Sequence, residues 1–100
     1  MVDFILENDT LAAFLRGDID HHSAKIMREK LDYQIANIRP RVLILDFEGV
    51  GFIDSSGIGL VMGRYKAMSA LGGEIKIENT SAYVSRMLKL GGIDVLFKIA

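Results

Sequence analysis

The chain has no cysteine, which excludes disulfide bonds, thiolate zinc sites and catalysis by a thiol. It also lacks any uninterrupted apolar run near the roughly 18 residues that are needed to cross a bilayer. The amino-terminal segment MVDFILENDT is acidic and has no basic region before an apolar stretch, so it is not typical of a signal peptide. We therefore expect a cytoplasmic protein without a membrane span.

An excess of charge of either sign is missing as well, since the net charge is only -1. Basic residues are not gathered into a patch, so the phosphate backbone of a nucleic acid has little to bind, and we expect no direct nucleic-acid partner. Hydrophobic residues make up 50% and charged residues 25% of the chain, which is the balance of a folded globular protein. Its 100 residues leave room for one core, which predicts a single domain over residues 1–100.

The apolar patterns along the chain predict an α/β fold. Alternating or continuously apolar segments predict strands at 2–7, 10–16, 42–45 and 74–78, with 95–97 as a fifth candidate. Apolar residues three and four apart predict helices at about 24–39, 56–70 and 81–90. Asp20 is a good N-cap for the first helix, and Pro40 ends it. Because the run 42–45 is apolar without alternation, we expect it to be a central strand that is covered on both faces. The order of elements predicts a mixed sheet of four to five strands with about three packed helices.

The segment GFIDSSGIGL at 51–60 joins a predicted strand to a predicted helix. Asp54, Ser55 and Ser56 fall at the start of that helix, where each side chain could cap the free backbone amides. One cap is enough, so at least one of the three is left for another role, and a serine hydroxyl at such a junction is open to a kinase. A hydrolytic role is not supported, because a nucleophile elbow needs Gly-x-Ser-x-Gly, and the residue two positions before each serine is not glycine.

Glycines within the same predicted helix have two readings. A glycine inside a helix costs about 1 kcal/mol relative to alanine, so Gly59 and Gly63 predict that either the sheet or a partner approaches this helix face closely, and we expect it to be the sheet. The alternative is nucleotide binding, in which Gly57, Gly59 and Gly63 cradle a phosphate and Glu78 binds a ribose. Against it, the Gly-x-Gly-x-x-x-Gly spacing is not the common one, and the chain is short for a two-halved dinucleotide fold.

A second cluster of polar residues precedes the first helix. Asp18, Asp20, His21 and His22 are of the types that bind metals. Their adjacent positions give no preformed tetrahedral geometry, so polar residues of a first helical turn are the expected reading, without a metal.

Two motifs together resemble the STAS-domain anti-anti-sigma factors of bacteria. The first is DFEGVGFIDSSGIGL at 46–60, which continues to Lys66, and the second is GDIDHH at 17–22, which is similar to that family's Gly-Glu-Leu-Asp-His-His. The resemblance covers nearly the whole chain and implies the STAS fold. It also implies a phosphoprotein that regulates transcription, as in sporulation, through protein–protein interaction, without catalytic activity and without a cofactor.

The resemblance assigns roles to particular residues. It implies that Ser55 is the phosphoacceptor of an anti-sigma factor with serine kinase activity, and that Asp20 lies near it. The unphosphorylated form would bind the anti-sigma factor and release the sigma factor, and a PP2C-type phosphatase would restore it. The implied partner-binding residues are Asp20, His21, Asp54, Ser55, Ser56, Gly57 and Ile58.

One departure from the family concerns the carboxy terminus, where a final helix that members usually have is not found after Lys98. Two alternatives to the anti-sigma role remain open in the sequence. One is a STAS scaffold or stress-signalling component that is served by another kinase, and the other is the small nucleotide-binding domain considered above.

Overall fold

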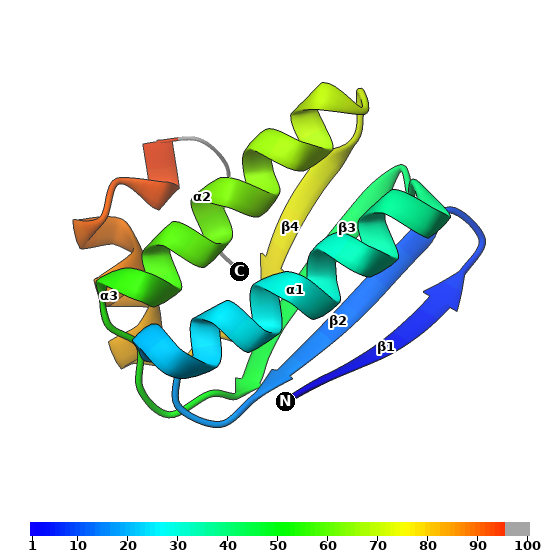
Figure 1. Ribbon diagram of the computed structural model, residues 1–100. Coiled ribbons are helices and arrows are strands. Elements are labelled where there is room, and N and C mark those ends of the chain that lie inside the picture. The colour runs from blue at the N-terminus through cyan, green and yellow to red at the C-terminus, as the bar shows by residue number, and fades with distance from the viewer. Residues whose placement is uncertain (96–100) are drawn as a thin grey trace.

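A single mixed sheet forms the centre of the computed structural model, which describes residues 1–95 (Figure 1). Its four strands are β1 (Val2–Glu7), β2 (Thr10–Arg16), β3 (Val42–Gly49) and β4 (Glu74–Glu78), in the order β1-β2-β3-β4. The first two strands form an antiparallel hairpin, whereas β2, β3 and β4 are parallel to one another. The mixed sheet and the central position of β3 confirm the sequence-based prediction.

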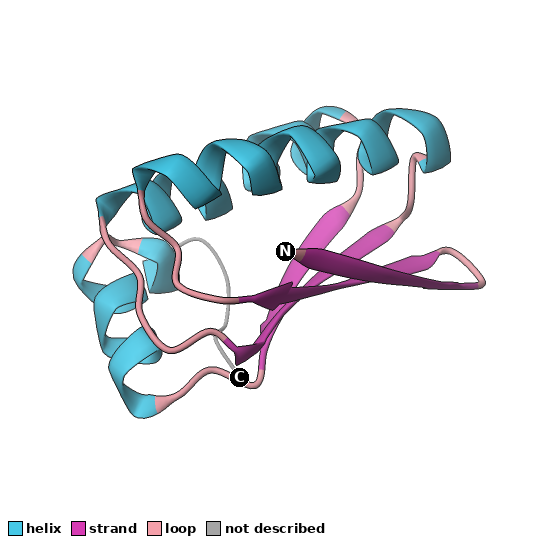
Figure 2. Cartoon of the chain, turned by 60° about the horizontal axis from the view of Figure 1, so that its bottom comes forward, coloured by secondary structure: helices cyan, strands magenta, loops and turns pink. Residues whose placement is uncertain are grey.

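Three helices connect and flank these strands: α1 (His21–Ile38), α2 (Ser55–Ala70) and α3 (Ala82–Leu90). Figure 2 shows α1 and α2 side by side over one face of the sheet, while α3 lies at the end of the sheet from which the loops lead into α1 and α2. A short 3-10 helix, η1 (Ile93–Val95), follows α3. The predicted strand at 95–97 is therefore not formed at Val95, and its other two residues lie outside the described part of the chain.

The core lies between the sheet and the two long helices. Leu43, Leu45 and Phe47 of β3 point into it and are almost fully buried. Val42 and Ile44 point to the other face and are only half-buried, so the prediction that β3 is covered on both faces is wrong. The physical reason is the strand order. The crossover from β2 to β3 through α1 and the crossover from β3 to β4 through α2 step across the sheet in the same direction. Because both crossovers are right-handed, they place α1 and α2 on the same face of the sheet.

Local signals in the sequence set the ends of the first elements. Asn8 adopts a left-handed conformation, with φ of 56°, in the turn of the β1–β2 hairpin. Asp20 caps α1 as predicted, and the helix ends where Arg39, just before Pro40, takes φ of 50°. Among residues 1–95, none of the helices has the length and hydropathy needed to cross a membrane.

The prediction that the sheet closely approaches Gly59 and Gly63 is wrong. A Cβ atom built on either glycine would meet no described atom within 4 Å. The close approach is instead at Gly57, where an added Cβ would lie 3.0 Å from Cβ of Ile53 and 3.3 Å from Cγ2 of Ile19. Gly57 belongs to the buried face of α2, whereas Gly59 is exposed and Gly63 half-buried, so these two lie off that face.

An ion pair between a buried arginine and a half-exposed aspartate joins the two long helices. Nε of Arg64 on α2 lies 3.0 Å from a carboxylate oxygen of Asp32 on α1, and only 6% of Arg64 is exposed. Within the described chain, Nη1 of Arg64 is buried without a hydrogen-bond partner. Burial lowers the pKa of Arg64, while the carboxylate of Asp32 opposes that shift. Asp32 therefore compensates a charge that is costly to bury.

We expect Asp32→Asn to lower the free energy of unfolding by about 1–2 kcal/mol, because it leaves the buried guanidinium of Arg64 without its counter-charge. This loss of stability is smaller than the loss expected for a fully buried ion pair, because the Asp32 side chain is half exposed. Urea denaturation monitored by circular dichroism measures the change. Arg64→Met removes the charge and keeps most of the volume, so it should cost less than Asp32→Asn. Equal unfolding midpoints for Asp32→Asn and the wild type would contradict the role given to the pair.

Candidate functional site

The loops that lead into α1 and α2 are held together by backbone hydrogen bonds. Ile19 N–H donates to the carbonyl of Phe52 at 2.8 Å, and Asp54 N–H donates to the carbonyl of Ile19 at 3.1 Å. Ile19 and Ile53 thus form an isolated parallel bridge beyond the ends of β2 and β3. The bridge places the amino termini of α1 and α2, and with them both sequence motifs, beside each other.

The start of α1 is fixed by a reciprocal pair of hydrogen bonds. Ser23 N–H donates to the Asp20 carboxylate at 2.9 Å, and Asp20 N–H donates to the Ser23 hydroxyl oxygen at 3.0 Å. The hydroxyl of Ser23 in turn donates to the carbonyl of Asp18 at 2.7 Å. The hydrogen bond from the Ser23 backbone, together with the one from its side chain, lowers the pKa of Asp20. Asp20 is therefore an ionised cap that faces solvent.

The start of α2 has a single cap, and it is not a serine. The carboxylate of Asp54 accepts a hydrogen bond from Ser56 N–H at 2.7 Å. Ser55 is the first residue of the helix and is exposed, whereas Ser56 is half-buried. Ser55 is thus an exposed residue at the positive end of the helix dipole, where an added negative charge is favoured.

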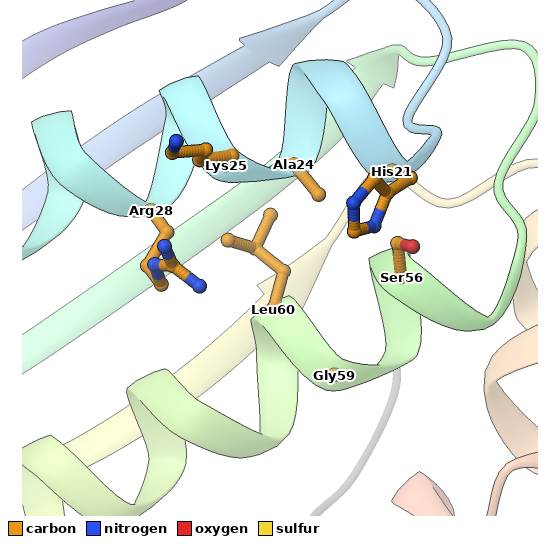
Figure 3. Close-up of a pocket in the computed structure, with 7 residues that line it drawn as sticks. All are labelled: His21, Ala24, Lys25, Arg28, Ser56, Gly59 and Leu60. Atoms are coloured by element: carbon orange, nitrogen blue, oxygen red, sulfur yellow. The ribbon is translucent and has the colours of Figure 1, made fainter.

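A shallow groove of about 330 Å³ runs between the first turns of α1 and α2 (Figure 3). In Figure 3 the imidazole of His21 and the side chain of Ser56 point toward one another across it. Gly59 lies on the α2 side, where the absence of a side chain leaves the groove open. The full lining is His21, Ala24, Lys25, Arg28, Ser56, Gly59 and Leu60. Its charged residues, Lys25 and Arg28, are basic, so the groove next to the exposed serine favours acidic groups.

The predicted site residues do not all reach the surface. Asp20, His21 and Ser55 are exposed, and Asp54 and Ser56 are half-buried. The other two have packing contacts: Gly57 is buried against Ile53, and the half-buried Ile58 fits against Gly91, where an added Cβ would lie 2.7 Å from Ile58 Cδ1. Gly57 is therefore buried beneath the surface that the other residues form.

The histidine and carboxylate side chains of the second motif are not gathered around a common point. Across residues 1–95, no group of three or more histidine or carboxylate side chains is placed to hold a metal ion. The glycines of the nucleotide-binding alternative, Gly57, Gly59 and Gly63, all lie within α2. A glycine-rich phosphate loop would instead precede the helix, so the geometry does not favour that alternative.

Sequence reasoning missed four residues of this region. Lys25 and Arg28 line the groove, and their positions on α1 gave no signal beyond that of a solvated helix face. Phe52 and Tyr83 form an exposed stacked pair beside the Ser55 loop. Phe52 lies in the first motif, but Tyr83 comes from α3, and nothing in the sequence places that helix beside the loop.

The fold and the two joined motifs define a STAS domain. The STAS domain family model matches residues 5–100, and the chain belongs to this family. It is 35% identical over 85 residues to an anti-sigma F factor antagonist of Paenibacillus polymyxa, a match that covers 85% of this chain and 70% of that protein.

Two solved structures of the antagonist SpoIIAA are also similar to the chain. The unphosphorylated form superposes with a TM-score of 0.85 at 29% identity and covers all of this chain and 88% of the other. The phosphorylated form of the Bacillus protein superposes with a TM-score of 0.76 at 28% identity, over all of this chain and 91% of the other. The STAS fold that was expected from the two motifs is thereby confirmed.

Proposed function

We propose that this protein is an anti-sigma factor antagonist that is switched by phosphorylation of Ser55. In its unphosphorylated form it binds an anti-sigma factor and so releases the sigma factor for transcription. The anti-sigma factor is also the serine kinase, and a PP2C-type phosphatase reverses the modification. The protein acts in the cytoplasm by binding and not by catalysis, and needs no cofactor.

The observation that carries this proposal is the exposed Ser55 at the first position of α2, beside a cap that Asp54 already supplies. Because Asp54 satisfies the helix start, the Ser55 hydroxyl is not needed for capping and can be modified without loss of the cap. Ser56, one residue further, is half-buried in the groove and is the poorer acceptor.

A phosphate on Ser55 should leave the fold in place. It brings about -1.5 to -2 charges to a helix N-terminus, where the free amides and the dipole stabilise it by about 0.3–1 kcal/mol. The similarity of the chain to both the phosphorylated and the unphosphorylated forms of SpoIIAA supports this view, since a common fold matches both. The switch must then act on the surface and not on the core.

The surface around Ser55 explains how the switch would work. Asp54 and Asp20 already place two carboxylates at the joined helix starts. A phosphate on Ser55 would add bulk and a further negative charge beside these carboxylates. The partner surface is fitted to a neutral hydroxyl at this position, so the phosphate would disrupt the contact. Binding is lost by local exclusion, while the rest of the domain is unchanged.

Phosphorylation of Ser55 can be tested with the purified protein, ATP and its anti-sigma kinase. We expect intact mass to rise by one phosphoryl group and fragmentation to place it on Ser55. Ser55→Ala should remain unmodified. Ser56→Ala is the matched control, because it removes the neighbouring hydroxyl and should be phosphorylated like the wild type. A phosphoryl group on Ser56, or none with a kinase that is active on another substrate, would contradict the proposal.

A further inference from the structure

Two exposed aromatic side chains lie next to the phosphoacceptor loop. The rings of Phe52 and Tyr83 stack with their centroids 6.1 Å apart and an interplanar angle of 19°. They remain 44% and 37% exposed in spite of that contact. Because the two rings stack on each other and both stay partly exposed, they form one apolar patch at the surface, which we call the aromatic platform.

Hydrogen bonds to the surrounding backbone hold the aromatic platform in place. The carbonyl of Phe52 accepts the hydrogen bond from Ile19 N–H, and the hydroxyl of Tyr83 donates to the carbonyl of Ile53 at 3.2 Å. Tyr83 stands in the first turn of α3, which Ser81 caps through a hydrogen bond from Val84 N–H at 3.1 Å. The hydrogen bond of the Tyr83 hydroxyl and the stacking contact between the two rings therefore position both rings before any partner arrives, which lowers the entropy cost of binding.

We propose that Phe52 and Tyr83 are the apolar anchor through which this protein binds its anti-sigma factor, an inference that rests on the proposed function. The platform is continuous with the site, since Phe52 is three residues before Ser55 and Tyr83 bonds to the carbonyl that lies between them. An anti-sigma factor that covers Ser55 would also cover the platform. The contacting surface of that partner is apolar and covers both rings.

The two parts of the site then have different tasks. Interface energy is concentrated in a few aromatic anchors that become fully covered, and tyrosine is among the residues most enriched in that role. The groove is lined partly by Ala24 and Leu60 and partly by basic side chains, but it presents no phenylalanine or tyrosine ring. The platform supplies affinity, and Ser55, at its edge, decides whether the partner can approach.

Truncation of the platform tests this division. Phe52→Ala and Tyr83→Ala should each weaken binding of the unphosphorylated protein to the purified anti-sigma factor by about 10- to 100-fold in titration calorimetry. Tyr83→Phe keeps the ring and loses only the hydroxyl, so its affinity should stay within a few-fold of the wild type. Tyr33→Ala is the matched control, since Tyr33 is 68% exposed on α1 and lies about 18 Å along that helix from His21.

The outcomes separate this inference from the proposed function. Circular dichroism first establishes that each variant is folded. If Phe52→Ala and Tyr83→Ala bind like the wild type while phosphorylation of Ser55 still abolishes binding, the platform is not the anchor and the switch stands. If Tyr33→Ala is weakened as strongly as the platform variants, the anchor is not confined to this surface, which also overturns the inference. If the unmodified wild type binds no anti-sigma factor, both the anchor and the proposed function are wrong.

Discussion

Phosphorylation of Ser55 is expected to weaken binding to the anti-sigma factor by about 10²- to 10³-fold, because a like-charge contact in an interface costs several kcal/mol. Two features concentrate the effect at this position: Ser55 is exposed at the start of α2, and Asp54 next to it is already a carboxylate. Titration calorimetry with the phosphorylated and unmodified proteins measures the ratio of affinities. Ser55→Glu carries less charge than a phosphate, so it should show the same loss to a smaller degree.

Two controls separate exclusion at the surface from a change of fold. Ser55→Ala should bind as tightly as the unmodified protein, since within residues 1–95 the Ser55 hydroxyl makes no hydrogen bond that the substitution would remove. The amide exchange of α2 should be unchanged or slightly slower after phosphorylation, because the phosphate stabilises the helix start. Faster exchange throughout α2 in the phosphorylated protein would show that the modification melts the helix, and local exclusion would then be wrong.

Local patterns were sufficient to predict most elements of the fold. The hairpin turn at Asn8, the cap at Asp20 and the end of α1 before Pro40 each depend on the conformational preference of one or two residues. Such preferences act within a few positions of the chain, so they can be read without knowing the topology. The mixed sheet followed from the order of these elements.

Features that depend on how elements face each other were not predicted correctly. The apolar run of β3 would look the same in the sequence whether helices cover one face of the sheet or both. Ile44 is only half-buried because α1 and α2 both lie on the opposite face of the sheet. Similarly, the helical pattern of the sequence does not distinguish the three glycines of α2, which are Gly57, Gly59 and Gly63. Which of them meets another element depends on the rotation of α2 about its axis, which the spacing of its apolar residues fixed only loosely.

The candidate site was predicted in part for the same reason. Ser55 and Asp54 follow from the capping pattern at the start of a helix, but the exposure of Ser55 depends on Asp54 being the residue that caps. Tyr83 is 28 positions beyond Ser55 and reaches the site only because α3 lies at that end of the sheet. A long-range contact of this kind has no local signal in a single sequence.

Gly57→Val is expected to destabilise the protein by about 2–3 kcal/mol, because it forces a branched side chain into a packed contact. Even the first added carbon would lie 3.0 Å from Cβ of Ile53, and both Ile53 and Ile19 are fully buried. These two residues also form the bridge that joins the starts of α1 and α2. The substitution should therefore lower the midpoint of urea unfolding and also disturb the positions of the two helix starts. The rate of Ser55 phosphorylation should then change as well.

Gly63→Ala is the matched control for that experiment, in the same helix and with the opposite expected sign. An added Cβ at Gly63 meets no described atom within 4 Å, so the change should raise the free energy of unfolding by about 0.5–1 kcal/mol through helix propensity alone. Equilibrium urea unfolding of both variants measures the two changes in the free energy of unfolding by the same method. If Gly63→Ala proved as destabilising as Gly57→Val, the close approach would extend along the helix. The assignment of Gly57 as the single point of tight contact among the three glycines would then be wrong.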